Sequence, residues 1–65
     1  MKITVNGVGR EVRSTMLAEA LEELDYATAV IATALNGHFV ATAARSSTVL
    51  AEGDQVEVVA PMQGG

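Results

Sequence analysis

The stretch that decides the fold is DQVEVVAPMQGG, residues 54–65. Val56 and Val58 alternate with other residues in the period of two that is typical of a strand with one buried face. We therefore predict a strand over Gln55–Ala60. Pro61 has no N–H to donate to a sheet, so the strand ends there and a short tail, about residues 61–65, follows it.

The tail ends on Gly64-Gly65. Two residues without side chains can enter a narrow slot in another protein, and the main-chain carboxylate of Gly65 is open to attack. Chain ends are also the ordinary place for frayed, idle residues. The preceding residues therefore decide whether Gly64-Gly65 indicates a functional tail.

The N-terminal segment predicts a hairpin. Lys2–Asn6 alternates polar and apolar residues, as a half-buried strand does. Asn6-Gly7 suits a type I′ turn, whose two central residues both have positive φ. The returning strand is predicted over Arg10–Arg13, with Val12 facing inward.

An amphipathic helix is predicted over Met16–Leu24, with Leu17, Leu21 and Leu24 on one face. Ser14 or Thr15 can cap its first turn through a side-chain oxygen. A helix this short is unstable alone and must pack on a sheet.

Two further strands are predicted over Val30–Leu35 and His38–Val40, joined by a second hairpin turn at Asn36-Gly37. Residues 41–47 fit a helical turn and a loop equally well.

Together these elements predict one α+β domain, residues 1–65, with a single mixed sheet and one main helix on one face. The other face has no second layer, so part of it should be open to a partner. Val59 points to that side and Met62 follows it, which predicts a partner surface there. The predicted core is Ile3, Val5, Leu17, Leu21, Leu24, Val56 and Val58.

Composition narrows the function. The 65 residues carry a net charge of −4, and the four basic residues are scattered, which argues against nucleic-acid binding. Apolar stretches are too short to span a membrane, and no basic segment followed by a long apolar run opens the chain. We therefore expect a cytoplasmic protein. The absence of cysteine excludes disulfides and thiolate metal sites.

Side chains that could carry chemistry are few. His38 is the single histidine, and Glu52 and Asp54 lack the further ligands that a metal requires. Tyr26 is better explained as a ring over the end of the helix. We expect no catalytic residue, no metal and no cofactor bound by this chain, which leaves the Gly65 carboxylate as its distinctive group.

The order of these segments resembles the thiamine-biosynthesis sulfur carrier family, ThiS, within the superfamily of ubiquitin and the small subunit of molybdopterin synthase. The segments that carry the resemblance are Ile3-Thr-Val5-Asn6-Gly7, Leu17-Ala-Glu-Ala-Leu21-Glu-Glu-Leu24, Ala34-Leu35-Asn36-Gly37, Leu50-Ala-Glu-Gly53-Asp54-Gln-Val56-Glu57-Val58-Val59 and Gln63-Gly64-Gly65. They cover nearly the whole chain.

The resemblance implies a β-grasp, ubiquitin-like fold and a carrier rather than an enzyme. It implies that a ThiF-like adenylyltransferase uses ATP to convert the Gly65 carboxylate into an acyl-adenylate. A sulfur donor system then supplies cysteine-derived sulfur, which displaces AMP, and a ThiG-like thiazole synthase takes the sulfur. Met62, Gln63 and Gly64 would be the tail that enters the partner's channel.

Three features depart from the family pattern. Met16 stands where many members have a helix-capping threonine, residues 41–47 match no family segment closely, and Pro61 is closer to the molybdopterin synthase subunit. Three alternatives stay open: a sulfur carrier for molybdopterin or RNA thiolation, a ubiquitin-like modifier joined to lysines through Gly65, and a binding module with an idle terminus.

Overall fold

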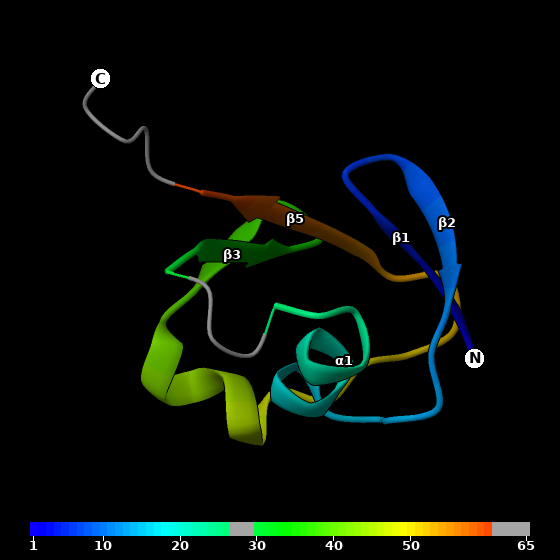
Figure 1. Cartoon of the computed structure of the whole chain (residues 1–65), viewed down its shortest axis with the longest axis horizontal. Helices are drawn as coiled ribbons and strands as arrows, with labels where there is room; N and C mark the ends of the chain where they lie inside the picture. The colour runs from blue at the N-terminus through cyan, green and yellow to red at the C-terminus, as the bar shows by residue number, and fades with distance from the viewer. Residues whose placement is uncertain (27–29, 61–65) are drawn as a thin grey trace.

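A computed structural model describes residues 1–26 and 30–60, which form a five-stranded mixed sheet with its helices on one side (Figure 1). The elements in chain order are β1 (Lys2–Val5), β2 (Val8–Glu11), α1 (Leu17–Glu23), β3 (Ala32–Leu35), β4 (His38–Val40), the 3₁₀ helix η1 (Thr42–Ser47) and β5 (Gln55–Val59). The strand order is β2-β1-β5-β3-β4. The predicted α+β architecture is confirmed.

The last strand lies in the middle of the sheet. β5 pairs in parallel with β1 and antiparallel with β3, and the two hairpins extend the sheet outward on either side. In Figure 1 both α1 and η1 lie below the sheet, so its opposite face has no helical cover among the described residues.

Both predicted hairpin turns are present. Asn6 and Gly7 have φ of 52° and 83°, and Asn36 and Gly37 have 51° and 84°, as type I′ turns require. The predicted return strand over 10–13 was wrong in its bounds. A two-residue turn pairs Val5 directly with Val8, so β2 begins at Val8.

The predicted cap of α1 was also wrong. Met16 is the N-cap residue, and no side chain caps the helix there. The Leu17 N–H instead donates to the Thr48 carbonyl at 2.8 Å. Ser14, the expected cap, is occupied elsewhere, because its hydroxyl donates to the Glu23 carboxylate. The segment after η1 therefore takes over the capping role from a distant part of the sequence.

The end of α1 has Schellman geometry. The Tyr26 N–H donates to the Leu21 carbonyl at 2.8 Å, and the Asp25 N–H donates to the Glu22 carbonyl at 3.1 Å. Asp25 takes the left-handed conformation, with φ of 69°, where glycine is more usual. Tyr26 packs against the core at this end, as predicted.

The core lies between the sheet and the two helices. Six of the seven predicted core residues are buried, and Leu24 is half-buried against their edge because α1 ends before it. Buried apolar residues that the core prediction did not include are Val12, Ala20, Ile31 and Leu50.

Residues 41–47, left open by the sequence, form η1 after Ala41. Arg45 anchors this helix to the sheet: its Nε donates to Thr33 Oγ1 at 3.0 Å and its Nη2 to the Ile31 carbonyl at 2.7 Å. Thr33 is the buried polar residue of the sheet, and its hydroxyl donates to the Val40 carbonyl. The buried hydroxyl therefore has partners on both sides.

We predict that Leu21→Ala lowers the free energy of unfolding by about 2–5 kcal/mol, the range for a buried leucine. Leu21 is 4% exposed, whereas Leu24 on the same helix is only half-buried and provides the control. Thermal or urea unfolding should show a much smaller loss for Leu24→Ala. Equal losses would contradict the described facing of α1.

We also predict a pH-dependent contribution from Glu23. Its carboxylate accepts bonds from the Ser14 hydroxyl, the Arg13 N–H at 2.9 Å and the Ser14 N–H at 2.7 Å. The Ser14 hydroxyl first, and then the Arg13 N–H, hold the pKa of Glu23 below its ordinary value of 4.5. This stabilisation is fully present above the unfolded-state pKa and is lost as the pH falls through the folded-state pKa.

The melting temperature of Glu23→Gln should therefore lie below that of the parent near neutral pH, and the gap should close as the pH falls from the ordinary pKa of 4.5 through the lower folded-state pKa of Glu23. Glu22→Gln is the matched control, because the Glu22 side chain makes no hydrogen bond among the described residues. A gap for Glu23→Gln that stays constant with pH would contradict the role of the carboxylate.

Candidate functional site: the open face beside β5

Most of the predicted site lies outside the described residues. Met62, Gln63, Gly64 and Gly65 all follow Ala60, where the described chain ends. What the structure does describe is the strand from which they continue. The geometry of the site is therefore that of β5 and of the surface around its last residues.

Val59, the predicted partner residue, lies on the uncovered face of the sheet. Its neighbours Val56 and Val58 are buried, whereas Val59 is 63% exposed, so the predicted alternation along the strand is confirmed. Val59 pairs directly with Ala32 of β3. Two small apolar side chains therefore adjoin at this end of the sheet.

The apolar surface extends from Val59 to β4. Phe39 is 74% exposed and pairs directly with Ala34 of β3. Both side chains lie on the same face of the sheet as Val59 and Ala32. Val59, Ala32, Ala34 and Phe39 line a shallow groove of about 190 Å³, which Glu57 borders. Val30, 78% exposed, lines an adjoining hollow with Val59 and Ala32. We call Val30, Ala32, Ala34, Phe39 and Val59 the open-face patch.

Phe39 is the largest member of the patch, and the sequence prediction had not included it. A signal was available, because β4 was predicted correctly and its residues alternate between faces. Val40 packs against the core, so its neighbour Phe39 has to point the other way. An aromatic side chain on an uncovered face is a common feature of protein contact surfaces.

The two turn asparagines do more than form turns. The side chain of Asn6 bonds both main-chain groups of Val58, with the Val58 N–H donating to Asn6 Oδ1 at 2.8 Å. Asn36 accepts a bond from the Gln55 N–H at 2.9 Å and donates to Asp54 Oδ1 at 3.1 Å. The two side chains therefore hold β5 near its two ends.

The side chains considered for catalysis have other surroundings. His38 is exposed at the start of β4. The Glu52 carboxylate accepts the Lys2 N–H and so joins its turn to β1, whereas Asp54 Oδ2 accepts the Ala51 N–H within the turn itself. Within residues 1–26 and 30–60, no three His, Cys, Asp or Glu side chains gather as metal ligands would.

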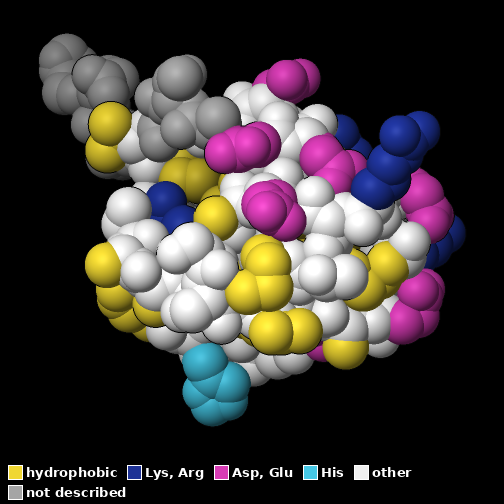
Figure 2. All heavy atoms as spheres, turned by 90° about the horizontal axis from the view of Figure 1, so that it is seen from below, with side chains coloured by type: hydrophobic (Ala, Val, Ile, Leu, Met, Phe, Trp, Pro, Cys, Tyr) yellow, Lys and Arg dark blue, Asp and Glu magenta, His cyan; other side chains and the backbone are white. Residues whose placement is uncertain are grey.

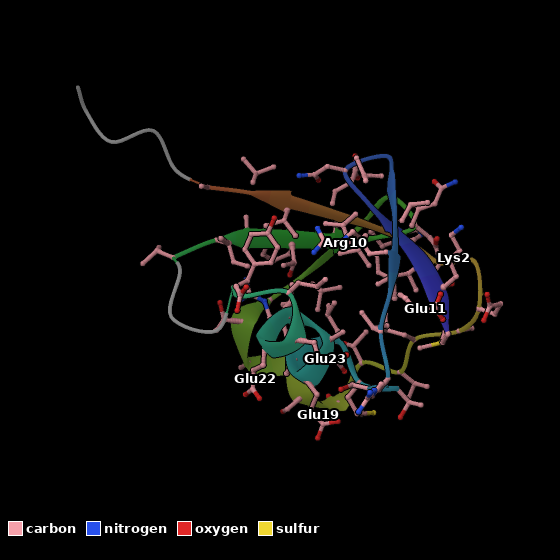
Figure 3. The ribbon with its side chains drawn as sticks, turned by 45° about the vertical axis from the view of Figure 1, so that its right-hand side comes forward. Lys2, Arg10, Glu11, Glu19, Glu22 and Glu23 are labelled. Carbon is pink, nitrogen blue, oxygen red and sulfur yellow. The ribbon has the colours of Figure 1, made fainter. Side chains whose placement is uncertain are left out.

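Acidic side chains gather on the side of α1 that faces away from the sheet. Figure 3 shows Glu19, Glu22 and Glu23 around α1, and Figure 2 shows Asp and Glu side chains spread over this side of the molecule. Lys2 and Arg10 lie on the hairpin of β1 and β2, with Glu11 beside them. The helix side is thus charged, whereas the patch beside β5 is apolar.

Comparison with known proteins identifies the family of the chain. The model of the ThiS family matches residues 3–65, which is nearly the whole chain. The chain belongs to the ThiS family. Among curated proteins, none matches it significantly.

Two solved structures support the same conclusion. A crystal structure described as thiamine biosynthesis protein ThiS from Geobacter metallireducens is 33% identical, with a TM-score of 0.83 and 100% of each chain covered. A solution structure described as a thiamine biosynthesis protein from the same organism is 32% identical, with a TM-score of 0.77, covering 100% of this chain and 88% of the other. The β-grasp fold expected from the sequence is confirmed.

The described residues contain no helix long and apolar enough to cross a bilayer.

Proposed function

We propose that this ThiS-family protein is a cytoplasmic sulfur carrier for thiamine biosynthesis, and that its working group is the carboxylate of Gly65. The observation that carries the proposal is the family match, which runs to residue 65 and so includes the terminal Gly64-Gly65. The likeness to solved thiamine biosynthesis proteins supports the choice of pathway over molybdopterin synthesis or RNA thiolation.

The proposed chemistry takes place on partner enzymes. A free carboxylate is a poor acyl donor. In the active site of a ThiF-like adenylyltransferase, a Gly65 carboxylate oxygen attacks the α-phosphorus of ATP and pyrophosphate leaves. Hydrosulfide, HS⁻, delivered by the donor system then attacks the acyl carbon and displaces AMP, and loss of the S–H proton gives a thiocarboxylate. A ThiG-like thiazole synthase accepts that sulfur.

In this scheme the folded domain is the part that partner enzymes recognise, and it keeps the reactive terminus covalently attached. The chain supplies neither a catalytic residue nor a cofactor in this scheme, and ATP binds to the partner. Because the thiocarboxylate stays attached to a folded protein, it is delivered to the next enzyme and not released to water. Gly64, Gln63 and Met62 form the part that enters the partner's channel.

The open-face patch is the proposed docking surface for the adenylyltransferase. It includes the end of the strand from which the tail continues, and three of its members, Val30, Phe39 and Val59, are largely exposed. Burial of exposed apolar area is the main favourable term in protein association. A partner that covers this patch would also hold the start of the tail.

We predict that Val59→Asp raises the Kd for the adenylyltransferase at least about tenfold. Desolvating an unpaired carboxylate costs more than the roughly 1.4 kcal/mol that a factor of ten requires. Val8→Asp is the matched control: Val8 is 60% exposed, against 63% for Val59, but lies on β2 at the far edge of the sheet. Calorimetric titration in which both variants bind like the parent would remove the patch from the proposal.

Deletion of Gly65 should abolish sulfur acceptance and leave the melting temperature unchanged. The shortened chain ends one residue early, which is about 3.3–3.6 Å along an extended chain. Reacting atoms must approach to about 3–3.5 Å, so this displacement prevents the reaction. Adding one residue after Gly65 should fail for the same reason.

The test is incubation of each form with the adenylyltransferase, ATP and a sulfur source, followed by intact-protein mass spectrometry. The parent should exchange one terminal oxygen for sulfur. A truncated chain that still accepts sulfur, or still supports thiazole formation, would show that the terminal carboxylate is not the working group.

A further inference from the structure

The side chain of Asn6 takes the place of a strand residue beside β5. The ladder between β1 and β5 advances two residues at a time: the Thr4 N–H donates to the Asp54 carbonyl at 2.9 Å, and the Asn6 N–H donates to the Val56 carbonyl at 2.9 Å. Val58 is the next residue of β5 in this series. At that level β1 has already ended, because the chain turns away at Asn6.

The carboxamide of Asn6 supplies the missing rung. Its Nδ2 donates to the Val58 carbonyl at 3.0 Å, and its Oδ1 accepts the Val58 N–H at 2.8 Å. Both bonds are partly buried. A carboxamide carries a donor and an acceptor, as a peptide group does, so one side chain satisfies both main-chain groups of Val58.

This contact lies close to the end of the strand. Val58 is followed in β5 by Val59 alone, and Gly65 comes seven residues after Val58. On the other edge of β5, β3 pairs with Val59 through Ala32. On the β1 edge, the hydrogen bonds of the described residues extend no further than the two from Asn6.

We propose that Asn6 is a positioning residue: together with the pairing of Val59 to β3, it holds the end of β5 in place and thereby sets the number of residues between the sheet and the terminal carboxylate that enters a partner's active site. This inference rests on the proposed carrier function. A partner docked on the open-face patch holds the sheet, so the distance from the sheet to the partner's reactive centre must match the length of the segment that follows β5.

If the last residues of β5 separate from the sheet, the segment between the sheet and the Gly65 carboxylate becomes longer. Each residue released from β5 adds about 3.3–3.6 Å of reach. This is as large as the approach distance of reacting atoms, about 3–3.5 Å, so a frayed end places the carboxylate less often in a reactive position. A loss of this kind lowers kcat more than it weakens docking.

Asn36 offers a matched control within the same chain. It occupies the same position of the same turn type as Asn6, with φ of 51° against 52°. Its side chain bonds Gln55 and Asp54, at the opposite end of β5. Glycine suits the positive φ of this position, so Asn6→Gly and Asn36→Gly each remove one side-chain contact while the turn is retained.

The experiment measures two properties of the parent and both variants. The first is hydrogen exchange of the Val58 amide by NMR, which reports the contact without any partner. The second is steady-state adenylation by the ThiF-like adenylyltransferase with ATP, resolved into kcat and KM for the carrier. For Asn6→Gly we expect faster Val58 exchange, a kcat lower by about tenfold or more and a KM within about threefold of the parent. Asn36→Gly should match the parent in Val58 exchange and in kcat.

Asn6→Asp tests the inference by partial rescue. Aspartate retains an acceptor for the Val58 N–H and tolerates the left-handed conformation, but it has no donor for the Val58 carbonyl. Its Val58 exchange and its kcat should both lie between those of the parent and of Asn6→Gly. If Asn6→Gly does not fold, the same two measurements on Asn6→Asp decide the question, with both values expected to differ from the parent.

Three outcomes would overturn the inference: Val58 exchange unchanged in Asn6→Gly, a parental kcat despite faster exchange, or an equal fall in kcat for both glycine variants. A rise in KM alone would assign Asn6 to docking and overturn the positioning role. If the parent itself is not adenylated, the carrier function fails and the positioning role fails with it, whereas the Val58 exchange still shows whether the contact forms.

Discussion

The pairing of β5 along both of its edges is the constraint on which the rest of this small domain depends. β5 joins the N-terminal hairpin to the β3–β4 hairpin, and its inward residues Val56 and Val58 complete the core under α1. A domain of 65 residues with no cysteine has few other ways to hold its parts together. The strand that closes the fold is also the strand from which the tail continues, so one element links stability to function.

The helices cover only one face of the sheet, and this explains where a partner can bind. α1 and η1 pack on one side of the sheet (Figure 1). On the other side, Val59 and Phe39 are exposed among the described residues. Glu19, Glu22 and Glu23 project from α1 on the covered side (Figure 3), whereas the open-face patch consists of apolar side chains. Under the proposed function, the open-face patch is the surface on which a partner enzyme would dock.

The sequence predicted those features that depend on local pattern. The two Asn-Gly turns, the alternation of Val56, Val58 and Val59, and the leucine face of α1 follow from neighbouring residues alone. Contacts between distant segments were missed. The N–H of Leu17 is satisfied by Thr48, and Asn6 pairs with Val58, because tertiary packing brings together residues that no local pattern relates. The site beyond Ala60 rests on family likeness and not on described geometry.

Under the proposed function, sulfur is carried on the carboxylate of Gly65. To test this, the native host is grown with cysteine that carries a heavy sulfur isotope. This protein is then isolated, and its C-terminal peptide is analysed by mass spectrometry. We expect labelled sulfur in place of one oxygen of the Gly65 carboxylate. An unlabelled terminus, or Gly65 found joined to lysines of other proteins, would contradict it.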